Sequence, residues 1–156
     1  MKNILFVCTG NTCRSSMAEA LLRHILEREG LASRYIANSA GTSAFPGMPA
    51  SHNAIQALAA LGIDLSQHCA SLVNEEIIDK ADLILTMTAA HKRHLCRMKP
   101  EAAGKIFTLK EYCGETACAD VEDPFGGDLE TYISCRNDIM GKLEILIEKL
   151  KTKGDI

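Results

Sequence analysis

The sequence predicts an α/β fold, a four-stranded parallel sheet with helices on both faces. Short apolar runs of strand length alternate along the chain with longer segments whose apolar residues recur at helical spacing. Strands that alternate with helices are joined by crossover connections, and these give parallel sheets covered on both faces. No repeat, low-complexity tract or linker interrupts the 156 residues. We therefore expect a single domain over residues 1–156, long enough to bury a full core.

The first strand and the first helix flank a polar turn. Residues 4–7 form a continuous apolar run, which is typical of a buried strand. After the turn, Ser16 and Glu19 fit a capping box that would open a helix, and Gly30 is placed to end it. The apolar stripe of this helix would contain Met17, Leu21, Leu22, Ile25 and Leu26.

The next segment of the chain predicts a second strand and a second helix. Residues 35–40 read as the strand. Pro49 suits the first turn of the helix, because proline fixes a helical φ and its missing N–H is not needed there. Gly62 follows the end of this helix, whose core face would contain Ile55, Leu58 and Leu61.

The second half of the chain supplies two more strands and the longest helix. Residues 83–87 and 106–109 are apolar runs that predict the third and fourth strands, and a helix follows the first of them from about Ala89. Asp128 can cap a final helix, since its carboxylate can accept a free N–H group of the first turn. The apolar side of that helix would contain Ile133, Ile139, Met140, Leu143, Ile147 and Leu150.

Composition argues against several classes of protein. The net charge is −3 and basic residues are not in excess, so we expect no nucleic-acid partner. No segment is long and apolar enough to span a membrane, and the apolar run after Lys2 is too short for a secretory signal. Seven cysteines in such a chain indicate reduced thiols in the cytoplasm rather than a disulfide framework.

The scattered histidines and cysteines do not predict a metal site. No C-x-x-C pair occurs, which argues against structural zinc. His91, His94 and Cys96 are close in sequence, but lysines and arginines surround them, so we interpret this segment as a solvated basic helix face. Cys113 and Cys118 have no neighbouring chemistry and are interpreted as bystanders.

The turn after the first strand carries the strongest chemical signal. Cys8 and Arg14 are six positions apart, in the pattern C-x5-R. In a loop of this length, backbone N–H groups, the start of the next helix and a guanidinium fork can all face one anion, with the thiol beneath it. The alternative is that Cys8 is an ordinary buried cysteine at a strand end. The sequence predicts a phosphate-binding loop after the first strand, made of Thr9, Gly10, Asn11, Thr12, Cys13, Arg14 and Ser15.

A second signal lies between the last strand and the last helix, at Asp123 and Pro124. The proline fixes its own φ and biases Asp123 away from helical conformation, so the carboxylate is held on a loop. Taken alone, the pair is a common turn. Together with the loop at Cys8, it predicts an acid that leans over the bound anion and supplies a proton.

These residues resemble the low-molecular-weight protein-tyrosine phosphatase family. The resemblance rests on Cys-Thr-Gly-Asn-Thr-Cys-Arg-Ser at residues 8–15, Asn-Ser-Ala-Gly at residues 38–41, and Asp-Pro at residues 123–124, and it spans nearly the whole chain. It implies a four-stranded parallel sheet, a phosphocysteine intermediate, and no metal or other cofactor. Ser16 stands where the family usually has proline, and we expect it to cap the helix instead.

The chemistry expected from this resemblance uses three catalytic residues. Cys8 attacks phosphorus as a thiolate, Arg14 binds two phosphoryl oxygens, and Asp123 protonates the leaving group and later activates water. Ser15 would donate a hydrogen bond to the sulfur, and Asn11 would hold the shape of the loop.

Three further roles are implied by the resemblance. Ser39 and His68 would support Asn11 from outside the loop, although His68 as an ordinary core or surface histidine remains open. Cys13 would close a reversible disulfide with Cys8 and protect it from further oxidation. The alternative for Cys13 is that it only packs beneath the loop.

The substrate is predicted from two positions, Thr12 and Phe125. In the branch of the family that acts on phosphotyrosine, a larger aliphatic residue replaces the threonine, and two aromatic residues follow Asp-Pro. Here Phe125 is followed by Gly126, and Thr12 with Asp-Pro-Phe-Gly-Gly resembles the bacterial protein-arginine phosphatases. A threonine leaves room and a hydrogen bond for a planar guanidinium.

We therefore expect phosphorylated proteins as partners and hydrolysis of phosphoarginine, with phosphotyrosine as the alternative. A remoter alternative is an arsenate reductase, but Cys69, Cys96, Cys113 and Cys118 do not fit its relay of cysteines. A sugar-transport phosphocarrier is argued against by Asp123, which serves hydrolysis. A non-catalytic phosphoprotein-binding module would not need a nucleophile, an arginine and an acid together.

Overall fold

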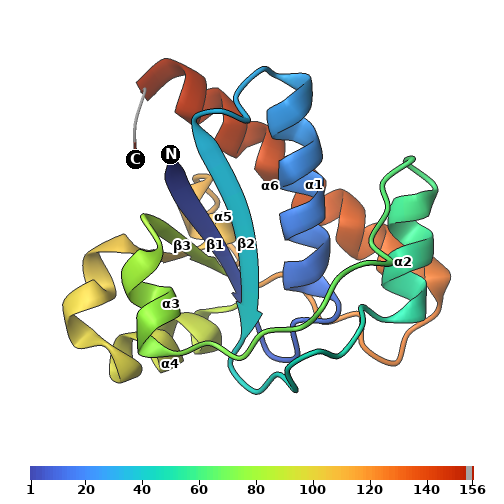
Figure 1. The fold of residues 1–156 in the computed structure, drawn as a ribbon, viewed down its shortest axis with the longest axis horizontal. Helices are drawn as coiled ribbons and strands as arrows, with labels where there is room; N and C mark the ends of the chain where they lie inside the picture. The colour runs from blue at the N-terminus through green and yellow to red at the C-terminus, as the bar shows by residue number, and fades with distance from the viewer. Residues whose placement is uncertain (154–155) are drawn as a thin grey trace.

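Four parallel strands form one sheet in the order β2-β1-β3-β4. The computed structural model describes residues 1–153 and 156. The strands are β1 (Lys2–Cys8), β2 (Tyr35–Gly41), β3 (Leu83–Thr86) and β4 (Ile106–Thr108), and all three pairings are parallel. The predicted fold class is confirmed, and β1 lies inside the sheet between β2 and β3 (Figure 1).

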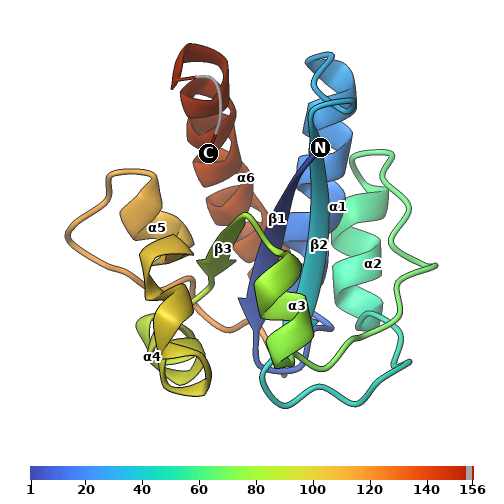
Figure 2. The same cartoon turned by 60° about the vertical axis from the view of Figure 1, so that its left-hand side comes forward.

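Helices cover both faces of this sheet. One face carries α1 (Arg14–Arg28), α2 (His52–Ala59), α5 (Leu109–Tyr112) and α6 (Leu129–Lys153), and the other carries α3 (Glu75–Lys80), α4 (Ala89–Met98) and the short 3-10 helix η1 (Pro100–Lys105). Figure 2 shows α3 on the opposite side of β1 and β2 from α1. The short elements α3, η1 and α5 were not predicted, because helices of one or two turns carry too little periodicity.

Alternate residues of β1 enter two separate cores. Ile4, Phe6 and Cys8 pack with α1 and α6, while Leu5 and Val7 pack with the residues of α3 and α4. All five are at most 3% exposed. A strand buried on both sides has no polar face, which explains why residues 4–7 are a continuous apolar run rather than an alternating one.

Two of the expected helix starts are wrong. Ser16 lies inside α1 and its hydroxyl donates to the Cys13 carbonyl at 2.9 Å, and Glu19 instead accepts from Ser39 on β2. No capping box therefore opens α1. The second helix begins after Ser51, whose hydroxyl accepts from the Ala54 N–H at 3.3 Å, because a serine side chain can cap a helix and a proline cannot.

Of the other predictions about the helices, two are wrong and two are confirmed. Pro49 lies before α2 rather than in its first turn, and Leu61 is 38% exposed, because α2 ends at Ala59 and the chain turns away. Gly30 follows α1 with a φ of 71°, and the Asp128 carboxylate accepts from the Thr131 N–H at 2.9 Å at the start of α6, so both of these predictions are confirmed.

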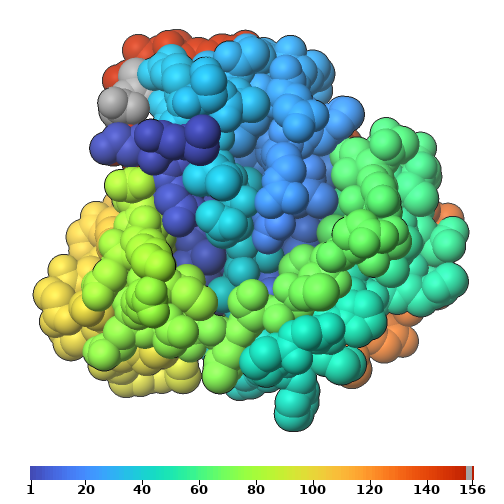
Figure 3. All heavy atoms as spheres, viewed as in Figure 1, coloured from blue at the N-terminus to red at the C-terminus, as the bar shows by residue number. Residues whose placement is uncertain are grey.

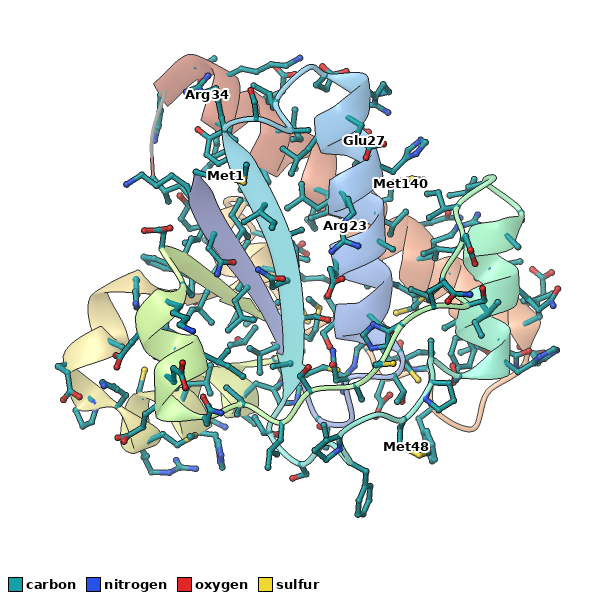
Figure 4. All side chains as sticks on the ribbon, in the orientation of Figure 1. Met1, Arg23, Glu27, Arg34, Met48 and Met140 are labelled. Carbon is teal, nitrogen blue, oxygen red and sulfur yellow. The ribbon has the colours of Figure 1, made fainter. Side chains whose placement is uncertain are left out.

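The end of β1 lies at one edge of the molecule with the loops that follow the strands. The space-filling view shows the segment between β2 and α2 projecting there (Figure 3), and Met48 of that segment lies at the same edge (Figure 4). Within residues 1–153 and 156, no helix has both the length and the apolar character needed to cross a membrane.

The last residue of β2 touches the turn that follows β1. A Cβ atom added to Gly41 would lie 2.4 Å from the Thr9 carbonyl oxygen and 3.0 Å from the Asn11 nitrogen. Both neighbours are backbone atoms, which cannot swing aside as a flexible side chain would. The close approach therefore requires glycine at this position.

We predict that Gly41→Ala lowers the free energy of unfolding by about 1–3 kcal/mol, because the new methyl group overlaps a fixed backbone. Urea denaturation measures this change. Gly141→Ala is the matched control: its Cβ would meet no atom within 4 Å in the middle of α6, so it should stabilise the protein by up to about 1 kcal/mol. Equal stability of the two variants would contradict the proposed constraint.

Candidate active site

The turn after β1 lies where parallel sheets bind ligands. It leaves the carboxyl end of a strand that has neighbours on both sides, and it leads directly into α1 (Figure 1). In open α/β sheets, ligands sit outside the carboxyl ends of the strands. We call residues 8–15 the anion loop.

The carbonyl groups of the anion loop point outward and are held there by hydrogen bonds. The carbonyls of Cys8 and Thr9 accept from the N–H groups of Thr42 and Ser43, at 2.9 and 3.0 Å, and the Thr12 carbonyl accepts from Ser51 N–H at 2.9 Å. In a trans peptide the next N–H points the opposite way from the carbonyl. Several N–H groups of the loop therefore face inward, as anion binding requires.

The start of α1 adds to this positive environment. Arg14 is its first residue, the N-cap residue Cys13 makes no side-chain hydrogen bond to the backbone of the first turn, and that turn holds no acidic residue. The free N–H groups of the first turn and the helix dipole then remain directed at the loop, where they favour a negative charge. The missing capping box is consistent with this arrangement, because a capping side chain would occupy those donors.

Asn11 connects the neighbouring backbone to the nucleophile candidate. It is fully buried and has a φ of 58°, a left-handed conformation that asparagine tolerates. Its side-chain oxygen accepts from the Ser71 N–H at 2.9 Å, and its side-chain nitrogen donates to the Ser15 hydroxyl oxygen at 2.8 Å. The Ser15 oxygen lies 2.8 Å from the Cys8 sulfur.

This chain of contacts directs a proton at the sulfur. Because Asn11 already donates to the Ser15 oxygen, the Ser15 hydroxyl uses its own proton for another partner. The Cys8 sulfur at 2.8 Å is closer than the alternative acceptor, the Ala40 carbonyl at 3.5 Å. A hydroxyl that donates to sulfur stabilises the thiolate form.

The two expected supports of Asn11 differ in the structure. His68 places Nε2 at 2.6 Å from the Asn11 carbonyl oxygen, a contact of the expected kind. Ser39 does not reach Asn11 with its hydroxyl, which donates to Glu19 of α1 at 2.6 Å. The prediction that Ser39 supports Asn11 is therefore wrong, because Ser39 binds Glu19 instead. The Ser71 backbone takes that place, and a backbone donor leaves no signature in a sequence.

Arg14 and Asp123 come together over the anion loop. The Arg14 side chain is 5% exposed, donates from one terminal nitrogen to the Val121 carbonyl at 3.0 Å, and places the other 3.5 Å from an Asp123 carboxylate oxygen. The Asp123 side chain is 54% exposed, and its second oxygen accepts from the Phe125 N–H at 3.1 Å. The segment after β4 thus fixes the Arg14 side chain through the Val121 carbonyl and also contains the acid, Asp123.

One cavity unites the residues of this site. Its volume is about 260 Å³, and its lining consists of Cys8, Thr9, Gly10, Thr12, Cys13, Arg14, Asp123 and Phe125. The two other members of the predicted loop, Asn11 and Ser15, are fully buried beneath it. The structure therefore brings the nucleophile candidate, the arginine and the acid to one opening.

Cys13 lines the cavity, and its side chain is largely buried. Its sulfur lies 3.3 Å from the Tyr132 hydroxyl and 3.5 Å from the Ser51 hydroxyl, and it is 6% exposed. Burial and the contact with Cys13 raise the pKa of Tyr132 to about 12. Cys8 and Cys13 are both free thiols, and their pairing under oxidation stays a prediction.

His91 is not part of a solvated basic face, and this interpretation was wrong. It is 7% exposed, and its ring nitrogens lie 2.9 Å from the hydroxyl oxygens of Thr9 and Thr88. Burial and, to a smaller extent, the charge of Arg14 lower the pKa of His91 to about 4. The first residue of α4 is Ala89, so His91 lies in the first turn, which points at the anion loop.

Two further buried cysteines lie outside this cavity. Burial raises the pKa of Cys113 to about 11 and that of Cys135 to about 12. The Cys113 thiol donates to the Lys142 carbonyl at 3.2 Å, which leaves it a poor nucleophile. Among residues 1–153 and 156, no three side chains of the His, Cys, Asp and Glu types are grouped to hold a metal ion.

Comparison with known proteins agrees with this geometry. Residues 3–155 match the family model described as low molecular weight phosphotyrosine protein phosphatase. A protein-arginine-phosphatase of Bacillus subtilis is 44% identical over 149 residues, which cover 96% of this chain and 97% of that protein.

Two solved structures are similar over the same extent. A mutant of the YwlE arginine phosphatase with a phosphorylated active-site serine has a TM-score of 0.91 at 42% identity and covers 97% of each chain. A low molecular weight protein tyrosine phosphatase from T. tengcongensis has a TM-score of 0.90 at 45% identity, with coverage of 96% of this chain and all of that one. With the anion loop and its acid in place, these matches show that the chain belongs to the low molecular weight phosphotyrosine protein phosphatase family.

Proposed function

We propose that this chain hydrolyses phosphoarginine in proteins through a phosphocysteine intermediate. The observation that carries the proposal is the single cavity of about 260 Å³ lined by Cys8, Arg14 and Asp123 together with Thr12 and Phe125. A nucleophile, an anion clamp and a proton donor at one opening are the parts that phosphoryl transfer through sulfur needs. The similar protein from Bacillus subtilis is named a protein-arginine-phosphatase, which supports the choice of phosphoryl group.

In the first step, the Cys8 thiolate attacks phosphorus. The sulfur–phosphorus bond forms as the bond from phosphorus to the guanidinium nitrogen of the substrate breaks. Asp123 donates its proton to that nitrogen, so the arginine side chain leaves in its stable form. The exposed position of Asp123 above the loop suits contact with a leaving group that belongs to a protein surface.

In the second step, water replaces sulfur on phosphorus. Asp123, now a carboxylate, takes a proton from the water as its oxygen bonds to phosphorus, and the bond from phosphorus to sulfur breaks. The Ser15 hydroxyl, 2.8 Å from the sulfur, stabilises the departing thiolate. Inorganic phosphate leaves, and the proton taken from water returns Asp123 to its acid form, while Cys8 is again a thiolate.

Arg14 binds the transferring group throughout. Its hydrogen bond to the Val121 carbonyl anchors one side of the guanidinium, which leaves further N–H groups for two phosphoryl oxygens. Since the side chain is buried and fixed before substrate arrives, it stabilises the transition state without reorganising.

Thr12 and Phe125 are proposed to set the specificity. Thr12 is half-buried in the cavity wall, and the hydrogen bond from Ser51 N–H to its carbonyl fixes its backbone. Phe125 is 78% exposed at the mouth, where it can pack on one face of a planar guanidinium. Gly126 follows with a φ of 80° and no side chain, so a second aromatic wall is missing.

We further propose phosphorylated proteins in the cytoplasm as the substrates. The seven cysteines of the chain, all of them free thiols in the structure, support that compartment.

Replacing Asp123 by Asn should lower kcat by about 10²–10⁴-fold, because the leaving nitrogen then receives no proton from the enzyme. Replacing Cys8 by Ser should abolish turnover. Steady-state kinetics on a phosphoarginine protein measures both effects. Glu122→Gln is the matched control, since this neighbour is exposed and does not line the cavity. A Cys8→Ser protein with normal turnover would rule out the phosphocysteine route.

Replacing Thr12 by Ile should reverse the substrate preference. The wild-type protein is expected to have the higher kcat/KM on a phosphoarginine protein, and Thr12→Ile the higher value on a phosphotyrosine peptide. The added bulk removes the room and the hydroxyl group that suit a guanidinium, an effect of about 10- to 100-fold. Thr12→Ser is the control that keeps the hydroxyl. A wild-type preference for phosphotyrosine would overturn the substrate assignment and leave the thiol mechanism intact.

A further inference from the structure

We propose that His91 is a positioning residue that acts through Thr9: its ring donates a hydrogen bond to the Thr9 hydroxyl oxygen, and the Thr9 proton is thereby directed at a phosphoryl oxygen in the anion loop. The inference rests on the proposed function, because it assigns Thr9 a part in binding the transferred group. Three hydrogen bonds of His91 and the position of Thr9 support it.

Thr9 stands between two hollows of the surface. It lines the cavity of the anion loop together with Cys8 and Arg14. It also lines an adjoining hollow that contains Thr88 and His91. Its hydroxyl can therefore contact His91 on one side and a bound anion on the other.

Counting protons assigns the direction of the hydrogen bonds. The Thr88 hydroxyl oxygen accepts from the His91 backbone N–H at 3.2 Å as the cap of α4. It also lies 2.9 Å from the ring nitrogen Nδ1 of His91. Among the described residues, Nδ1 is the acceptor found for the Thr88 hydroxyl proton, so we assign that proton to the bond with Nδ1, which then acts as an acceptor.

A neutral imidazole carries one ring proton, so that proton lies on Nε2. Nε2 is 2.9 Å from the Thr9 hydroxyl oxygen and donates to it. The ring stays neutral because burial and the charge of Arg14 lower its pKa to about 4, and His94 acts in the same direction; Asp120 and Asp123 act in the opposite direction without restoring the ordinary value.

The consequence falls on Thr9. With its oxygen accepting from His91, the hydroxyl has its own proton free for the cavity side. There it joins the inward N–H groups and Arg14 as a donor to the anion. The opposite tautomer would consume the Thr9 proton and turn an oxygen lone pair toward a phosphoryl dianion, which repels it.

The direct test is the protonation state of the His91 ring. Nitrogen-15 chemical shifts of the five histidine rings, assigned with a His91→Phe variant, distinguish Nε2–H from Nδ1–H and from the charged form. We expect Nε2–H for His91, with protonation only near pH 4. An Nδ1–H ring, or one that charges near the ordinary histidine pKa of about 6.5, would overturn the proposal. If His91 only packed in the fold, there would be no reason to expect one tautomer rather than the other.

The functional test is a double-mutant cycle. Thr9→Val and His91→Phe should each lower kcat/KM on the phosphoarginine protein and weaken inhibition by inorganic phosphate, by about 10- to 100-fold. The double variant should lose no more than either single one, because both remove the same hydrogen bond. Additive losses, or a His91→Phe protein with wild-type kinetics, would contradict action through Thr9.

Two further variants guard this cycle. His91→Gln keeps an N–H donor on a side chain of similar reach and should recover part of the lost activity. His94→Phe makes the same replacement one helical turn away and should stay within about twofold of wild type, since His94 lines neither of the two hollows that Thr9 joins. If His91→Phe unfolds at assay temperature, Thr9→Val and the ring shifts of the wild-type protein still decide the question. A wild-type protein without turnover would refute the proposed function, whereas the ring shifts and phosphate binding would still test His91.

Discussion

The anion loop depends on one constraint, that inward N–H groups require outward carbonyls with partners of their own. A buried carbonyl without a partner costs about 1–3 kcal/mol, and a loop with several such groups would not persist. The partners come from three segments: residues 42–43 after β2, Ser51 before α2, and His68. The folding of these segments around β1 is therefore what turns a short polar turn into a binding site. Gly41 has no space for a side chain for the same reason. The end of β2 has to lie close to the loop backbone so that the N–H groups of residues 42–43 can reach the loop carbonyls.

The same loop also gives its thiol surroundings that differ from those of another buried cysteine. Cys8 is as buried as Cys113, yet the two have opposite surroundings. Cys113 lies among apolar residues, and its thiol proton is satisfied by a carbonyl. Around Cys8 the same degree of burial is combined with the Ser15 hydroxyl, the uncapped start of α1 and the Arg14 guanidinium. Desolvation alone would favour a neutral thiol. A surplus of hydrogen-bond donors over acceptors is what the proposed mechanism needs, because it places a thiolate and a charged phosphoryl group in one small cavity.

The parts of the site that sequence can predict are those made by neighbours along the chain. The order strand, cysteine, loop, arginine and helix is local, and the alternation of strands and helices fixes where the loop must lie; both were predicted from the sequence. Asp123 could be placed because Pro124 marks a loop and because a second motif gave it a partner.

Contacts made through space were not predicted. The Ser71 N–H and the Val121 carbonyl are backbone groups that any residue would supply. Ser39 pairs with Glu19 because both face the gap between β2 and α1, a fact of packing that spacing does not reveal. The interpretation of His91 was wrong because the residues that follow it in sequence are basic, whereas its own position in the first turn of α4 faces inward.

The overall fold does not determine which phosphoryl group is hydrolysed. Structures named as an arginine phosphatase and as a tyrosine phosphatase superpose on this chain with TM-scores of 0.91 and 0.90. In the proposed mechanism, the loop and the arginine bind the phosphoryl group itself, which is the same on either side chain. What differs is the atom that leaves and the shape of the group attached to it. A phenolic leaving group offers a flat apolar ring and an oxygen, whereas a guanidinium offers a flat polar group whose nitrogens need hydrogen bonds at its edge. Discrimination must therefore come from residues that touch the leaving group, and in the proposed mechanism these are Thr12, Phe125 and Asp123, which line the cavity.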